Sequence, residues 1–78
     1  MSYDYYAEAK YLAETLKEEG FGDWALRILS AMEEGVTATE ILMMLRWNLE
    51  NFLKSQSGSE KVIDRAKQLN KKIDAALS

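Results

Sequence analysis

Glycine occurs at only four positions in the chain, and each lies between stretches whose apolar residues recur at helical spacing. These positions are Gly20, Gly22, Gly35 and Gly58, and proline is absent. The intervening stretches are rich in strong helix formers, and none alternates apolar with polar residues as a half-buried strand does. We expect Gly20 and Gly35 to end the first two helices. The pattern predicts a small all-α domain of four helices, in which consecutive helices are antiparallel neighbours joined by short turns.

The expected helices belong to one domain covering residues 1–78, because a chain of this length supports a single core. Their approximate ranges are 3–19, 23–34, 38–54 and 59–76. The third helix has the clearest start signal, since Thr37 and Glu40 match a capping box in which each side chain satisfies a free backbone N–H group. Ser57 and Glu60 repeat this spacing before the fourth helix, and Ser59 is an alternative cap.

The third expected helix is apolar on two opposite faces. Its larger stripe contains Ala38, Ile41, Leu42, Leu45, Leu49, Phe52 and Leu53. Met43, Met44 and Trp47 fall on the opposite side. Since a surface helix normally has one apolar stripe, either this helix is covered on both sides or its second face meets a partner. We expect helix 38–54 to be central in the domain, and we keep Met43, Met44 and Trp47 as a candidate dimer or second interface.

The first expected helix has an acidic face with one tyrosine in its middle. This acidic ridge consists of Asp4, Glu8, Tyr11, Thr15 and Glu18, which recur at helical spacing opposite an apolar stripe. Tyrosine contributes contact area at protein interfaces, and acidic groups around it raise the association rate with a basic partner. We therefore predict that the acidic ridge binds a protein partner. The alternative is an ordinary solvated helix face.

Histidine and cysteine are both absent from the sequence. The chain therefore has neither the most common general base nor a thiolate nucleophile, and it has no zinc site of the Cys/His kind and no disulfide. We expect a protein that is not an enzyme and that uses no metal and no cofactor. The longest apolar run, Ile41 to Leu45, is far too short to span a bilayer. Without a basic and apolar leader, the expectation is a cytoplasmic protein with no membrane association.

The charge is distributed unevenly along the chain. Residues 1–53 contain ten acidic and four basic side chains, whereas residues 54–78 contain three acidic and six basic ones. The formal net charge of −3 argues against a nucleic-acid binder, which needs a basic footprint. Helices 23–34 and 38–54 have the outline of a helix-turn-helix, but the second would present Glu40, Met43 and Trp47 with Arg46 as its one cation before Lys54. The acidic body suits a basic protein partner instead.

The segment from Gly35 to Trp47 (Gly-Val-Thr-Ala-Thr-Glu-Ile-Leu-Met-Met-Leu-Arg-Trp) resembles a stretch found in small bacterial helical proteins without an assigned activity. In size, acidity and helix number the chain is also similar to colicin-type immunity proteins, although no binding residue carries over from either resemblance. The expected function is a small cytoplasmic protein-binding module, such as an immunity or inhibitor protein that neutralises a basic toxin or nuclease by occlusion. The alternative is a homodimeric structural or regulatory helical protein that uses the Met43/Met44/Trp47 face.

Overall fold

Four α-helices make up most of the computed structural model, which describes residues 3–78. Helix α1 covers Tyr5–Glu18, α2 covers Gly22–Glu34, α3 covers Ala38–Ser55 and α4 covers Glu60–Leu77. The expected ranges differ from these bounds by at most two residues at any end. No strand occurs in the described part of the chain, so the expected all-α class is confirmed. Within the same residues, no helix combines the length and the apolar character needed to cross a membrane.

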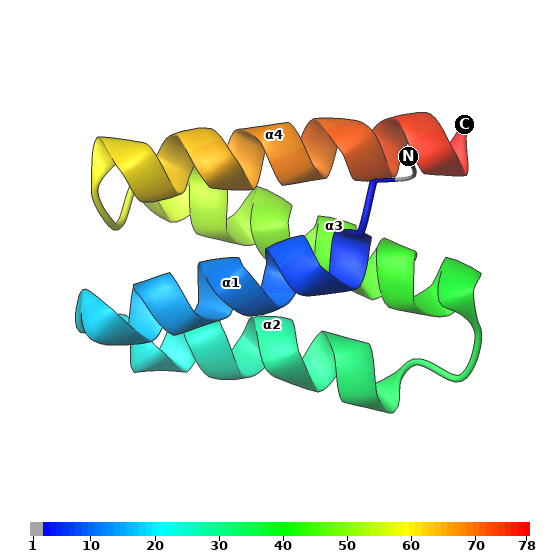
Figure 1. Cartoon of the computed structure of the whole chain (residues 1–78), viewed down its shortest axis with the longest axis horizontal. Coiled ribbons are helices and arrows are strands. Elements are labelled where there is room, and N and C mark those ends of the chain that lie inside the picture. The colour runs from blue at the N-terminus through cyan, green and yellow to red at the C-terminus, as the bar shows by residue number, and fades with distance from the viewer. Residues whose placement is uncertain (1–2) are drawn as a thin grey trace.

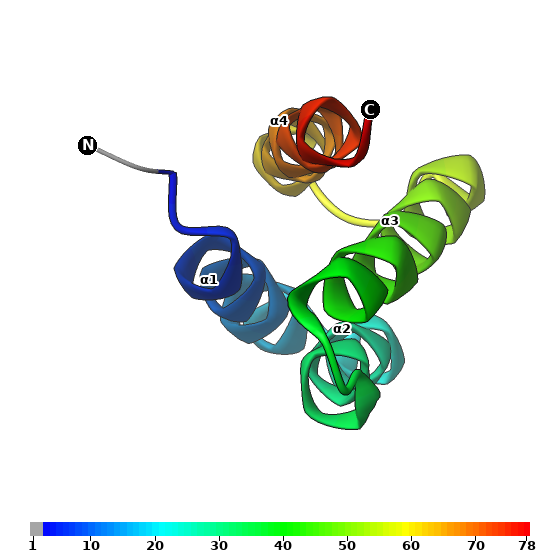
Figure 2. The same cartoon turned by 90° about the vertical axis from the view of Figure 1, so that its right-hand side faces the viewer.

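The helices form a ring in which each one contacts two others. Successive helices run in opposite directions (Figure 1), and an end-on view places the four helices at four corners (Figure 2). Helix α1 packs against α2 and α4, and α3 packs against the same two helices. Helix α3 is therefore not the central element that its two apolar faces suggested. Because α1 lies diagonally across the ring, it leaves the second face of α3 uncovered, and the side chain of Trp47 on that face is 64% exposed.

The core lies in the middle of the ring and receives one strip of side chains from each helix. The strip from α3 is centred on Leu45, Leu49 and Phe52, each of which is 0% exposed, so the larger predicted stripe of this helix does face the core. The remaining buried apolar residues are Ala9, Leu12, Ala13, Leu16, Ala25, Ile28, Ala31, Val62, Ala66, Leu69 and Ile73. Each strip follows the helical spacing of its sequence.

The turn between α1 and α2 is a Schellman motif. Gly20 has a φ of +91°, which glycine adopts without strain. Its N–H donates to the carbonyl of Lys17 at 3.1 Å, and the N–H of Phe21 donates to the carbonyl of Leu16 at 2.8 Å. These two bonds satisfy carbonyls that have no partner inside the helix. Gly20 thus ends the first helix as the sequence predicted.

The starts of α3 and α4 differ in detail from the expected capping boxes. The Thr37 hydroxyl accepts from the N–H of Glu40 at 3.1 Å, as expected, but the Glu40 carboxylate accepts from the N–H of Val36 at 3.2 Å rather than from that of Thr37. Helix α4 is capped by Ser59 and not by Ser57. The Ser59 N–H and hydroxyl both donate to the Glu19 carboxylate, at 3.0 and 2.8 Å, which ties the end of α1 to the start of α4.

Candidate functional site

An apolar groove of about 500 Å³ lies between α2 and α3, and we call it the α2–α3 groove. Its lining residues are Leu26, Arg27, Ser30, Ala31, Glu34, Met43, Met44, Trp47 and Asn48. Three large apolar side chains stand exposed in this one place, with Leu26 and Trp47 at 64% and Met43 at 50%. Single apolar residues on a surface are ordinary, but several gathered at one groove mark an interaction site.

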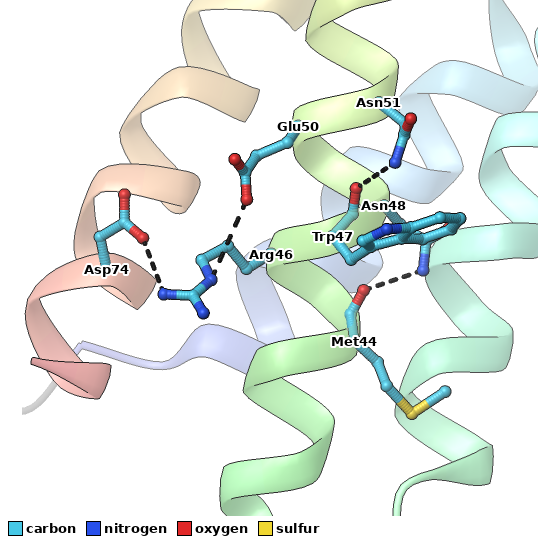
Figure 3. A network of polar contacts seen from close by, with 7 residues as sticks. All are labelled: Met44, Arg46, Trp47, Asn48, Glu50, Asn51 and Asp74. Atoms are coloured by element: carbon cyan, nitrogen blue, oxygen red, sulfur yellow. Dashed lines mark hydrogen bonds and ion pairs between the residues drawn. The ribbon is translucent and has the colours of Figure 1, made fainter.

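The floor of the α2–α3 groove is continuous with the protein core. Ala31 is 1% exposed, and Met44 is half-buried and packs against the core. Asn48 is the polar residue of the floor and is 9% exposed. Its Nδ2 donates to the main-chain carbonyl of Met44 at 2.9 Å, which satisfies a buried donor (Figure 3). The three residues of the candidate interface therefore have different environments. Met43 and Trp47 are exposed at the groove, whereas Met44 forms part of its floor.

Helix α3 separates its charged side chains from its apolar ones. Arg46 points toward α4, where its Nη1 lies 3.3 Å from Oδ1 of Asp74, and its Nε lies 4.0 Å from Oε1 of Glu50 (Figure 3). Trp47 points to the other side of the helix, and the carbonyl of this residue accepts from Nδ2 of Asn51 at 2.8 Å. The Arg46–Asp74 pair joins α3 to α4, the Arg46–Glu50 pair lies within α3, and the α3 wall of the α2–α3 groove carries no charged side chain.

The α2 side of the groove carries two opposite charges. Arg27 and Glu34 lie two helical turns apart, with Ser30 and Ala31 between them. The guanidinium carbon of Arg27 is 4.8 Å from the ring centroid of Trp24, a cation–π contact that favours this orientation of the side chain. Among residues 3–78, neither Arg27 nor Glu34 has an ion-pair partner. Their charges are thus available at the rim of the groove.

The middle of the acidic ridge faces helix α4. The Nη1 atom of Arg65 donates to Oε2 of Glu8 at 3.1 Å, and the guanidinium carbon of Arg65 is 4.3 Å from the ring centroid of Tyr11. Tyr11 is 41% exposed, as expected of a residue on the outer side of α1. Glu8 and Tyr11 thus take part in a contact between α1 and α4, in addition to lying on the acidic ridge. Since Arg65 is more than fifty residues away, local spacing gives no sign of the contact.

The other members of the acidic ridge have different surroundings. Asp4 is the N-cap of α1, where its Oδ1 accepts from the N–H of Ala7 at 3.0 Å. The hydroxyl of Thr15 donates to the carbonyl of Tyr11 at 3.0 Å, a bond within the helix. Glu18 is exposed in the last turn of α1. The structure therefore brings together Glu8 and Tyr11 through Arg65, and it does not gather the five residues into a cluster.

Sequence reasoning missed the contribution of α2 to the groove. Leu26 lies outside the buried stripe of α2, on the same side as the polar residues Arg27 and Ser30. An apolar residue on the polar face of a helix was the signal that the sequence offered for this part of the groove. An exposed leucine alone carries little meaning. Its importance comes from the position of α3, which places Met43 and Trp47 on the other side of the same groove.

Comparisons of this chain with family models, with curated proteins and with solved structures found no match. In the described residues, no three acidic side chains lie close enough together to hold a metal ion.

Proposed function

We propose that this chain is a small protein-binding module and that the α2–α3 groove is its binding face. The observation that carries the proposal is the exposure of Leu26, Met43 and Trp47 around one groove whose floor is part of the core. Burial of apolar surface stabilises a complex by about 25 cal/mol per Å² before the costs of association. Tryptophan at the centre of an apolar patch is a common hot spot, and methionine adapts to the shape of a partner.

The construction of the groove from two neighbouring helices favours a helical partner. Two neighbouring helices with apolar side chains on both rims form the type of surface that accepts the apolar face of an amphipathic helix. Trp47 and Leu26 would flank such a helix, and the small Ala31 leaves room for it above the floor. The Arg27 and Glu34 side chains at the rim would fix its direction by charge.

The α2–α3 groove is a stronger candidate than the acidic ridge of α1. Glu8 and Tyr11 already interact with Arg65, so a partner at the ridge would compete with a contact that joins α1 to α4. Trp47 and Leu26 have no such competing role, because most of each side chain is exposed. Three expectations stay predictions from the sequence: a basic partner at the ridge, an immunity or inhibitor role, and a cytoplasmic location. The proposed binding face depends on none of them.

Site-directed photocrosslinking tests the proposed binding face. A photoreactive diazirine amino acid replaces Met43 in cells that produce the chain naturally, and matched variants carry the same group at Glu18 or at Lys67, which is exposed on α4. We expect a covalent adduct of discrete mass from position 43 and none from position 67. Adding Trp47→Ser to the variant labelled at position 43 should abolish the adduct, while a circular dichroism melt confirms that this variant folds.

Three outcomes would contradict the proposal. If positions 43 and 67 gave the same adducts, or if neither gave any, the groove would not be a specific binding face. An adduct obtained from Glu18 but not from Met43 would instead transfer the binding face to the acidic ridge.

A further inference from the structure

We infer that the α2–α3 groove binds a second copy of this chain, with the two α2 helices antiparallel about a twofold axis near Ser30. This inference rests on the proposed function, since it names the occupant of the same groove. It is carried by the placement of charge and of small residues along α2, which is complementary to itself under a twofold rotation.

The charges on α2 provide the first argument. Arg27 and Glu34 are seven residues apart on the groove side of one helix, which is about 10 Å along the axis. In an antiparallel pair of α2 helices centred between them, Arg27 of each copy comes opposite Glu34 of the other copy. One charge of each sign per chain thus gives two ion pairs per dimer. The cation–π contact with Trp24 already limits the rotamers of Arg27, which reduces the entropy lost on pairing.

The residues between these charges provide the second argument. Ser30 lies at the centre of the proposed contact, Ala31 lies beside it in the floor of the groove, and both are small. Helix axes approach to about 8–10 Å according to the size of the side chains at the crossing, so this centre permits a close approach. Each α2 helix would then enter the groove of the other copy, and the exposed Leu26 and Trp47 would be covered on both sides of the axis.

The size of the molecule limits the strength of this dimer. The domain measures 30 × 24 × 22 Å, so one side of it is comparable with the roughly 800 Å² that each partner buries in an interface of standard size. Only the α2 and α3 portion of that side takes part. Since interfaces below the standard size are typical of transient complexes, we expect a reversible dimer that dissociates on dilution.

The test is sedimentation equilibrium of the purified full chain from about 1 µM to about 1 mM. The expected result is a shift from the monomer mass of 8.9 kDa to twice that value. Arg27→Glu and Glu34→Arg should each weaken the dimer about tenfold or more, because each variant places like charges opposite one another twice. Lys67→Glu is the control, a charge reversal of the same size on an exposed position of α4, and should have no comparable effect.

Mixing the two variants provides the decisive measurement. In a heterodimer of Arg27→Glu with Glu34→Arg, both facing pairs are again of opposite sign, so the mixture should associate more tightly than either variant alone. The double variant Arg27→Glu/Glu34→Arg should also recover self-association. These recoveries cannot result from misfolding, because a damaged chain would not be repaired by a second reversal. A circular dichroism melt of each variant provides an independent check of folding.

The inference and the proposed function fail in different ways. A chain that remains monomeric at the highest concentration overturns the inference, as does a dimer that is insensitive to both charge reversals or is not restored by mixing. In either case, a crosslink from Met43 to a different protein would leave the proposed function standing. If the variant labelled at position 43 also gave no adduct, both the proposed dimer and the proposed binding face would be ruled out.

Discussion

The guanidinium carbon of Arg65 in α4 lies 4.3 Å from the ring centroid of Tyr11 in α1, and the Nη1 atom of the same side chain donates to Glu8 at 3.1 Å. One side chain thus connects the first and last helices of the ring, which are far apart in sequence. The contact uses the planar shape of the guanidinium group, whose face stacks on the ring while its edge donates to the carboxylate.

Replacing Arg65 with alanine should lower the free energy of unfolding by about 1 kcal/mol. The value is modest because the side chains of Arg65 and Glu8 are 41% and 39% exposed, and solvent screens their attraction. Urea denaturation followed by circular dichroism measures the change. Arg65→Lys should recover only part of it, since lysine keeps the charge and loses the planar stacking. An equal loss for Lys67→Ala on the exposed side of α4 would show that the contact with Tyr11 has no special role.

Leu45→Ala and Leu49→Ala should each cost about 2–5 kcal/mol of stability. Both leucines are 0% exposed at the centre of the core, and truncation leaves a cavity that the surrounding helices fill only in part. For a domain of this size the loss is a large fraction of the total stability. Val36→Ala is the matched control, because Val36 is 87% exposed and the change should stay within about 0.5 kcal/mol. Thermal melts that match wild type for both leucine variants would contradict the assignment of this core.

Gly35 and Gly22 should respond to alanine in opposite directions. A Cβ atom at Gly35 would crowd the side chain of Ile41 and lie 3.0 Å from its backbone N and Cα atoms, so the turn between α2 and α3 must shift. At Gly22, in the first turn of α2, a Cβ meets nothing within 4 Å. Gly22→Ala should therefore raise stability by roughly 0.5–1 kcal/mol through the higher helix propensity of alanine, while Gly35→Ala should lower it. Chemical denaturation of both variants gives the sign, and a stabilised Gly35→Ala would refute the steric argument.

Burial raises the pKa of the Tyr3 phenol above its ordinary value of 10.0; the nearby Glu8 adds to the rise and Arg65 opposes it. The folded state therefore holds the phenolic proton more tightly than the unfolded state. This contribution to stability is fully present below pH 10 and is lost as the pH rises through the folded pKa. Tyr3→Phe should reduce the fall in stability above pH 10, measured by urea denaturation at a series of pH values. An unchanged fall would mean that Tyr3 ionises equally easily in both states.

The helices could be predicted closely because their signals are local. Gly20 and Thr37 mark boundaries through the backbone bonds that they permit, and these bonds involve residues only a few positions away. The arrangement of the helices was less accessible, because helical spacing shows which faces are apolar but not which of them are covered. Helix α3 was therefore expected at the centre, whereas α1 occupies the opposite corner and leaves Trp47 exposed.

The same limit applies to the candidate site. The apolar face with Met43 and Trp47 was visible in the sequence because these residues oppose the main stripe of their helix. The part of the groove that Leu26 contributes was not visible in the sequence, because it depends on the packing of α2 against α3. For the acidic ridge, spacing correctly placed Tyr11 at the outer side of α1, but its contact with Arg65 requires the first and last helices to meet.

The order of the helices around the ring also determines how quickly the chain can reach this structure. Each of the first three helices packs against the next one along the chain, and only the contact of α1 with α4 joins distant segments. Domains with mostly local contacts refold within microseconds to milliseconds. We expect the contact between α1 and α4 to form after the rate-limiting step, because it requires the longest loop to close. Weakening it at Arg65 should therefore accelerate unfolding and leave the refolding rate almost unchanged.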